Sequence, residues 1–342
     1  MYSFRNDYSE GVHPKILQTL TETNLVQTCG YGMDDCCKKA ADLIRQLCGA
    51  PDAGVHFVVG GTQANLLVIE SFLQPYECAI AAHTGHINVH ETGAIEATGH
   101  KVCTAYSPDG KVTPAMVEEV VAANTSEHMV LPRLVYISDT TEIGTVYTKA
   151  ELQALRDCCD KHGLYLYMDG ARLASALTAE GNDLTLADLA RLTDAFTIGG
   201  TKNGLLFGEA IILNIDLPKA HFRWHMKQRG AMLAKGRLLG IQFHGLMSDD
   251  LFFEIGRHAN AMALKLRDGM AALGYDFPTV SPSNQQFPVL PNAVIEQLIE
   301  IGYSFEDDHV VDADHTCVRF VTSWATPEEA IDQFLKDLKS CK

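Results

Sequence analysis

Seven short apolar runs, separated by stretches with helical periodicity, constrain the fold of this chain most strongly. Each run has the length and composition of a buried strand, and together they cover residues 55–59, 78–82, 102–106, 131–137, 164–168, 195–198 and 210–213. Helical patterns such as Pro114–Ala123 and Lys149–His162 lie between most of them. Strands that alternate with helices indicate an α/β fold, in which a mostly parallel seven-stranded sheet is covered by helices on both faces.

The pattern changes at both ends of the chain. Residues 1–12 are polar and turn-forming, and we interpret them as an arm that is either a loose terminus or a segment returning to an active site. Residues 13–245 then form the large domain. From about residue 246 a long helical pattern leads to Gly274, and two strand patterns and a last helix follow. We therefore predict a small α+β domain over 246–342.

Two apolar runs are followed by charged residues that could act together in one reactive site. Asp169 follows the run 164–168 and precedes Gly170, while Lys202 follows the run 195–198 and a Gly-Gly turn. Taken singly, Asp169 is explained as a helix cap and Lys202 as a solvated lysine. The carboxyl ends of strands in an α/β sheet are, however, where ligands bind, so the two residues form a candidate reactive pair.

A third strand end has the sequence of an anion-binding turn. The run 55–59 leads directly into Gly60-Gly61-Thr62 and then an apolar helix. Free backbone N–H groups at such a helix start can hold a phosphate, and the Thr62 hydroxyl adds a donor. The pattern is neither a Walker loop nor a dinucleotide fingerprint. An imine-forming lysine, a carboxylate and a phosphate cradle together suggest pyridoxal phosphate as the cofactor.

Histidines and cysteines carry weaker signals. His86 and His90 are four residues apart and would share a helix face, but without further ligands we predict no metal site and favour an imidazole lying near a cofactor ring. The ten cysteines include the adjacent pairs 36–37 and 158–159 and no C-x-x-C motif. We interpret them as reduced cysteines of a cytoplasmic protein.

Charge and hydropathy limit the partners of the protein. Acidic residues outnumber basic ones by 43 to 27, for a formal charge of −16, which disfavours nucleic acid and anionic membranes. No apolar segment approaches the length of a membrane span, and the N-terminus lacks a signal-peptide pattern. Residues 222–245 are unusually basic, and they form either a solvated face or a surface that contacts phosphate or another subunit.

In this order, the residues resemble the threonine aldolase/β-eliminating lyase family of fold-type-I pyridoxal phosphate enzymes. The resemblance runs from Arg5 to Thr322, and its best segments are Gly61–Leu66, His86 with Glu91, Asp169–Arg172 and Lys202. It implies a large domain of the aspartate aminotransferase type. It also implies a homodimer or homotetramer with active sites near subunit contacts.

The resemblance also implies a role for each site residue. Lys202 would hold pyridoxal phosphate as a Schiff base, Asp169 would pair with the pyridine nitrogen, and His86 would stack on the ring and act as base for the substrate hydroxyl, directly or through a water. Gly61 and Thr62 would hold the phosphate, with Lys227 or Arg229 from a neighbouring subunit, and Arg172 and Thr201 would also contact the cofactor. Asn6, Arg172 and Arg319 would bind the substrate, with the two arginines on its carboxylate. Four segments depart from the family pattern. Asn6 replaces a serine, Thr201-Lys202-Asn203 replaces S-K-G, residues 138–142 replace an Asn-Thr-His loop, and the glycine-rich stretch after residue 224 is thinner, at residues 228–231.

The expected activity is cleavage of L-threonine, L-allo-threonine or a related β-hydroxy amino acid to glycine and an aldehyde. A β-eliminating lyase and an aminotransferase are the alternatives within the same cofactor chemistry. A pyridoxal-phosphate-binding protein without turnover is a more distant alternative, and the lysine argues against it because binding alone does not require an imine.

Overall fold

The computed structural model describes residues 2–341, apart from the side chains of Leu217 and Lys219. The strands of the large sheet are β1 (Gly54–Val58), β2 (Glu77–Ala82), β3 (Lys101–Ala105), β4 (Leu131–Ser138), β5 (Tyr165–Asp169), β6 (Ala195–Gly199) and β7 (Glu209–Leu213). Their order across the sheet is β1-β7-β6-β5-β4-β2-β3. Neighbours from β6 to β3 are parallel, and β7 is antiparallel to both β1 and β6. The predicted seven-stranded, mostly parallel sheet is confirmed.

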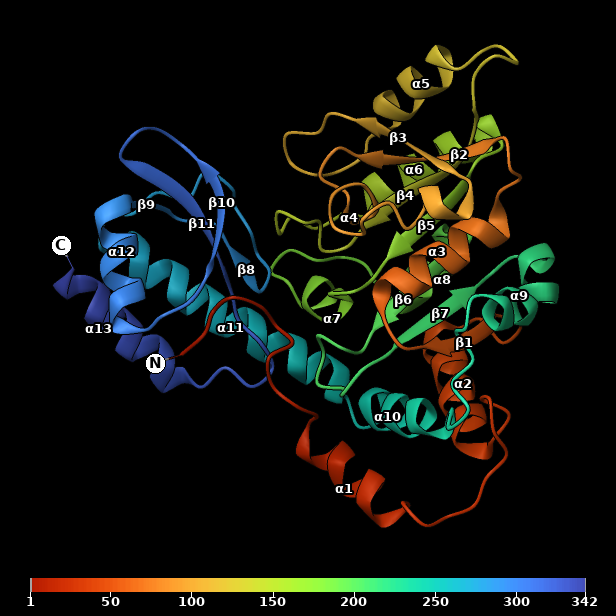
Figure 1. Cartoon of the computed structure of the whole chain (residues 1–342), viewed down its shortest axis with the longest axis horizontal. Coiled ribbons are helices and arrows are strands. Elements are labelled where there is room, and N and C mark those ends of the chain that lie inside the picture. Colours follow the sequence, from red (N-terminus) through yellow and green to blue (C-terminus); the bar gives the residue numbers. More distant parts are fainter. Residues whose placement is uncertain (1, 342) are drawn as a thin grey trace.

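Helices cover both faces of this sheet (Figure 1). The helices that precede the small domain are α1 (Pro14–Glu22), α2 (Asp35–Cys48), α3 (Gly61–Phe72), α4 (His86–Val89), α5 (Pro114–Ala123), α6 (Lys149–His162), α7 (Leu173–Leu177), α8 (Leu186–Leu192), α9 (Asp216–Gln228) and α10 (Arg237–Met247). Apolar residues of α2, α6, α8 and α10 share one buried cluster with the strands, and those of α3 and α9 share another. Alternate residues along each strand face the two clusters, as in Leu134–Val135 of β4.

The C-terminal part has its own sheet and core, seen at the left of Figure 1. Its elements are α11 (Leu251–Ala272), β8 (Gln285–Gln286), β9 (Val289–Pro291), α12 (Asn292–Ile301), β10 (Glu306–Val310), β11 (His315–Val321) and α13 (Glu328–Ser340). β11 is the centre of this sheet and pairs antiparallel with β8, β9 and β10. Phe4 of the N-terminal arm is fully buried in the same core, and its ring lies 5.3 Å from that of Phe334.

The structure refines the expectations for this region. The long helix predicted to lead to Gly274 is present as α11, but it begins at Leu251 and not near residue 246, because Asp249 and Asp250 have positive φ angles and separate α10 from α11. The strand β10 was not predicted at all. Its sequence Glu306–Val310 is mostly acidic and exposed, so it lacks the apolar alternation that marks a half-buried strand.

Candidate active site

Residues at or just after the ends of four strands surround one cavity of about 320 Å³. Asp169 ends β5, Lys202 lies in the turn after β6, His86 begins α4 after β2, and Gly61 begins α3 after β1. The cavity is lined by Tyr8, Val59, Gly60, Gly61, Thr62, His86, Ser138, Thr140, Glu142, Asp169, Ala171, Arg172, Thr201, Lys202, Phe207 and Glu209. The predicted meeting of Asp169, Lys202 and the glycine turn at one sheet edge is therefore observed.

The Asp169 carboxylate is held by three donors. Tyr136 donates its hydroxyl to Oδ2 at 2.8 Å, and Asn65 donates its amide to the same oxygen at 2.9 Å. The backbone N–H of Ala171 donates to Oδ1 at 2.9 Å. Asp169 is also 95% buried. A fixed, buried carboxylate at the cavity wall is a suitable partner for a protonated ring nitrogen.

The same network extends to His86. Glu91 accepts hydrogen bonds from Asn65 Nδ2 and from His86 Nδ1, both at 2.7 Å to Oε1, and Tyr167 donates to Asn65 Oδ1 at 2.7 Å. Burial alone would lower the pKa of His86, but the bond to Glu91 and nearby carboxylates raise that pKa overall. Because Nδ1–H is committed to Glu91, the neutral imidazole carries its lone pair on Nε2.

Lys202 has the environment of a nucleophilic amine. Within residues 2–341 its Nζ makes no hydrogen bond or ion pair, and burial together with the neighbouring Arg172 cation lowers the pKa of Lys202. A lysine with a lowered pKa is more often neutral, which is the form that attacks a carbonyl. The lysine is therefore suited to bind an aldehyde cofactor.

The start of α3 provides space for an anion. Gly60 is extended and supplies no side-chain cap, so the first N–H groups of α3 keep no side-chain partner from this residue. A Cβ built on Gly60 or on Gly61 would meet no atom within 4 Å. Free donors at the positive end of a helix dipole favour a phosphate. These features, with Lys202 and Asp169, fit pyridoxal phosphate.

Arg172 is anchored by the N-terminal arm. Its Nε and Nη2 atoms donate to Asp7 at 2.8 and 3.1 Å, and Asn284 Nδ2 donates to the same carboxylate at 3.0 Å. Burial alone would raise the pKa of Asp7, but Arg172 and Lys202 lower that pKa overall. Tyr8 lines the cavity. Of the two interpretations of residues 1–12, the structure supports the arm that returns to the site.

Four predicted site residues do not line this cavity. Asn6 turns its Oδ1 toward the N–H of Tyr8 and the hydroxyl of Ser9, and Arg319 lies on β11 with a buried Nε that has no partner among the described residues. Lys227 lies over the ring of Tyr31 at 4.8 Å. Arg229 forms an ion pair with Glu70, at 2.7 Å for Nε. Their proposed contacts to substrate and phosphate stay predictions.

Sequence reasoning also missed residues that the fold brings to the site. Asp7, Tyr8 and Glu142 come from irregular segments, and Tyr136 comes from the middle of a buried strand. Glu209 begins β7, and burial together with the Asp169 carboxylate raises the pKa of Glu209 well above its ordinary value. None of these positions carries a local pattern, and only the apolar run that follows Glu209 could have drawn attention to it.

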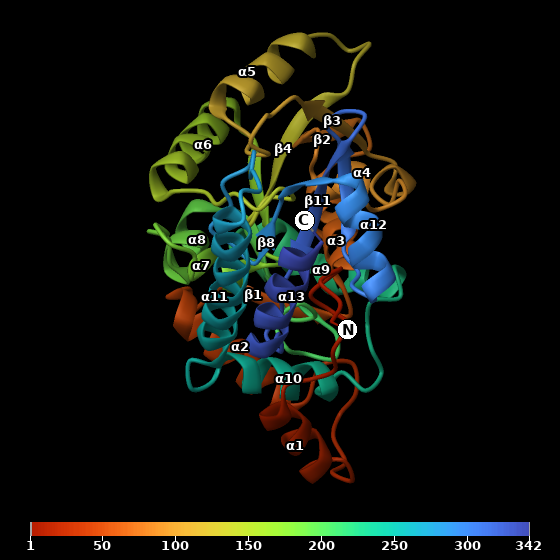
Figure 2. The same ribbon diagram turned by 90° about the vertical axis from the view of Figure 1, so that its left-hand side faces the viewer.

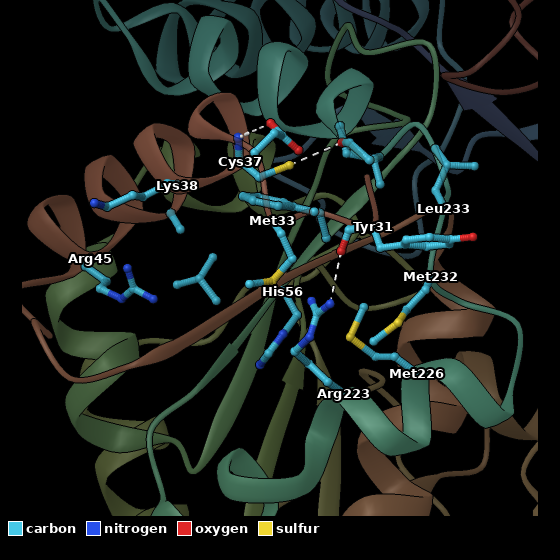
Figure 3. A pocket seen from close by; sticks show the side chains of 17 residues that line it. Tyr31, Met33, Cys37, Lys38, Arg45, His56, Arg223, Met226, Met232 and Leu233 are labelled. Carbon is cyan, nitrogen blue, oxygen red and sulfur yellow. Dashed lines mark hydrogen bonds between the residues drawn. The ribbon is translucent and has the colours of Figure 1, made fainter. Parts of the chain in front are cut away.

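A second cavity, of about 310 Å³, lies at the other edge of the sheet, between β1, α2, α9 and the loops that precede α2 and α10 (Figure 3). Its wall contains His56 and Arg223, whose side chains lie next to each other, and Arg223 donates to the backbone oxygen of Tyr31 at 3.1 Å. Burial, together with the smaller effect of the Arg223 and Arg45 cations, lowers the pKa of His56 to about 4. Tyr31 and Met33 in this wall are 47% and 66% exposed.

Comparisons with known proteins agree with this architecture. Solved structures with the same fold include an aspartate aminotransferase from Thermus thermophilus, which has a TM-score of 0.73 at 16% identity and covers 99% of this chain and 91% of its own. The fold is therefore the aspartate aminotransferase-like fold of pyridoxal phosphate enzymes, fold type I. The site and the fold together define a pyridoxal-phosphate-dependent enzyme.

The closer relatives specify the family. The sequence profile of the β-eliminating lyases matches residues 5–292. A low specificity L-threonine aldolase from Pseudomonas aeruginosa is 33% identical over 350 aligned residues, covering 98% of this chain and 96% of its own. The structure of a threonine aldolase from Leishmania major is 53% identical, with a TM-score of 0.98 and 99% of both chains covered. The chain belongs to the β-eliminating lyase family and is a pyridoxal-phosphate-dependent lyase.

Proposed function

We propose that this enzyme cleaves L-threonine, L-allo-threonine or a related β-hydroxy amino acid to glycine and an aldehyde. The main support is that one cavity brings together Lys202, whose pKa is lowered, the hydrogen-bonded Asp169 and the uncapped start of α3. The similarity to the threonine aldolases of P. aeruginosa and L. major supports the choice of substrate.

When bound, pyridoxal phosphate supplies an imine-forming aldehyde and a ring that accepts the electron pair released at Cα. Lys202 would hold the aldehyde, Asp169 the ring nitrogen, and Gly61 and Thr62 the phosphate. Thr201, which also lines the cavity, would complete the cofactor contacts.

The remaining residues would act on the amino acid. Arg172, held in place by Asp7, would orient the substrate carboxylate, and we propose Arg319 and Asn6 as further substrate contacts. His86 would take the proton of the β-hydroxyl on Nε2, directly or through a water, because its Nδ1–H is bound to Glu91. Loss of that proton allows the Cα–Cβ bond to break and the aldehyde to leave.

The experiment is a product analysis with purified, cofactor-loaded enzyme. L-threonine is added with alcohol dehydrogenase and NADH, so that acetaldehyde formation oxidises NADH, and glycine is measured separately. Equal amounts of acetaldehyde and glycine are expected. The β-eliminating lyase profile favours elimination as the second candidate, and formation of a keto acid and ammonia without glycine would establish that reaction instead.

We also propose that the enzyme is a homo-oligomer and acts in the cytoplasm. The exposed apolar side chains around the second cavity, Tyr31 and Met33 with Trp224 of α9, provide a surface for another copy of the chain. Lys227 and Arg229 of the same region would then reach the phosphate of a neighbouring subunit. All ten cysteines are free thiols, which suits a reducing compartment. Among the described helices none is both long and apolar enough to cross a bilayer.

A further inference from the structure

Outside the catalytic cavity, three potential metal ligands converge between α5 and α6. Cys158 and His162 are four residues apart in the last turns of α6, so their side chains share one face, and Glu118 comes from α5. One ligand atom of each residue lies within 4.8 Å of the others. Figure 2 shows the two helices next to each other at the outside of the molecule.

The spacing of these atoms is close to that of a tetrahedral zinc site. With Zn–S distances of about 2.3 Å and Zn–N and Zn–O distances of about 2.0–2.2 Å, tetrahedral ligand atoms are about 3.3–3.6 Å apart. His162 Nε2 and Glu118 Oε1 are 3.6 Å apart. Side-chain rotations that move the Cys158 thiol by about an ångström would complete the set.

The partners of these groups leave room for an ion. His162 Nε2 is buried and makes no hydrogen bond to any described residue, and the Cys158 thiol makes only a 3.8 Å contact with the carbonyl of Pro114. Lys161 lies 2.6 Å from the Glu118 carboxylate, so this carboxylate already holds a cation that a metal ion can replace. The last turn of α6 also presents its negative dipole end, which favours a cation.

We propose that Glu118, Cys158 and His162 bind a zinc-class divalent ion, with water in the fourth position. A thiolate, an imidazole and a carboxylate suit Zn²⁺ and not Mg²⁺ or Ca²⁺, which require oxygen ligands. The thiol proton leaves to solvent as the Zn–S bond forms. The ion links α5 to α6. None of its three ligands lines the cavity of Lys202.

Sequence spacing alone does not reveal this group, because Glu118 lies on a different helix from the other two residues. A comparable group, Asp308, His309 and Cys317, occurs on β10 and β11. There the His309 side chain is 58% exposed and bonds to the adjacent Asp308 at 2.8 Å. We assign no site to that group and use it as an internal control.

The test uses the cofactor-loaded enzyme after treatment with a chelator and desalting. Zn²⁺ binding is measured by equilibrium dialysis, and Co²⁺ is used as a spectroscopic probe because cobalt bound to thiolate gives a charge-transfer band in the near ultraviolet. The variants are Cys158→Ser, His162→Asn and Glu118→Gln, the last at an exposed position that leaves the core unchanged. Cys36→Ser and His309→Asn are the matched controls.

We expect one Zn²⁺ per wild-type chain and a cobalt–thiolate band. Each of the three variants should bind at least ~10-fold more weakly, as loss of metal-site groups does, while both controls bind as the wild type. Zinc should raise the Tm of the wild type and not that of Cys158→Ser. The proposal would be overturned if the wild type failed to bind Zn²⁺, or if Glu118→Gln and His162→Asn bound it as tightly as the wild type. A cobalt complex without the thiolate band would also overturn it.

Discussion

At the scale of single residues, one buried hydrogen-bond network holds both Asp169 and His86, the two side chains to which we assign catalytic roles. Asn65 donates one amide group to both Asp169 and Glu91, at 2.9 and 2.7 Å, and Glu91 in turn holds His86. The Asp169 carboxylate, which we propose pairs with the ring nitrogen, and the His86 imidazole, which we propose acts on the substrate, are thus both linked to Asn65. Removal of the Asp169 or the Glu91 carboxylate should therefore slow the reaction while most of the residues proposed to bind the cofactor stay in place.

Asp169 tests the electronic role of this network. Asp169→Asn keeps the shape of the side chain but removes the charge that keeps a pyridine nitrogen protonated. We expect pyridoxal phosphate to bind still, while kcat for threonine cleavage falls by about 10²–10³-fold, as for loss of one preorganised electrostatic group. Cofactor absorbance and steady-state kinetics measure the two effects. Near-normal kcat in a loaded variant would contradict the assignment.

His86 makes the reaction depend on pH in a defined direction. If Nε2 is the base, kcat/KM rises as pH increases through the pKa of His86, which is raised by the bond to Glu91. Glu91→Gln removes the carboxylate, lowers that pKa, and should shift the rising limb to lower pH. Profiles of kcat/KM for both enzymes provide the comparison. A limb that is unchanged or moves to higher pH would exclude His86 as the base.

At the scale of elements, the strands were predictable and the groups that approach them from elsewhere were not. β5 and β6 are apolar runs that stop at Asp169 and shortly before Lys202, so their ends could be located from the sequence. Asp7 pairs with Arg172 across 165 positions of the chain, and β10 is nearly all polar. Neither has a local signal, because long-range ion pairs and exposed strands leave no periodicity.

Helix packing around the sheet can be tested through one glycine. A Cβ on Gly240 of α10 would lie 2.4 Å from the backbone nitrogen of Cys37 in α2, whereas one on Gly245 of the same helix would be 3.1 Å from a side-chain atom of Ile16. Gly240→Ala should lower the free energy of unfolding by about 1–3 kcal/mol through overpacking. Gly245→Ala serves as the matched control and should change stability little. Urea denaturation measures the free energy of unfolding of both variants. Equal losses of stability would show that α2 and α10 can move apart to accommodate the added methyl group.

At the scale of the whole molecule, the two cavities lie at different edges of the sheet and have different surroundings. The cavity that contains Lys202 lies at the carboxyl ends of β5 and β6, next to the N-terminal arm. The second cavity is bordered by exposed apolar side chains, and the basic residues of α9 lie beside it. This distribution is the reason for proposing subunit contacts there and catalysis at the first cavity.

Subunit contact can be tested by charge. Met33→Glu combined with Trp224→Glu places two carboxylates on side chains that are 66% and 72% exposed. We expect sedimentation velocity to show smaller species than the wild type, because burying an unpaired charge opposes association. Tyr76→Glu, at a side chain that is 62% exposed elsewhere, should keep the wild-type assembly. A double variant that sediments as the wild type would place the interface on another face.

Lys202 is expected to form an imine with pyridoxal phosphate, and reductive trapping tests this assignment. The purified enzyme is loaded with the cofactor, reduced with borohydride, digested and analysed by mass spectrometry. On this assignment we expect a pyridoxyl group on Lys202 alone. It should be absent from Lys202→Ala and unchanged in Lys149→Ala, where a surface lysine is removed from an ion pair with Asp188. A label on another lysine, or full labelling of Lys202→Ala, would contradict it.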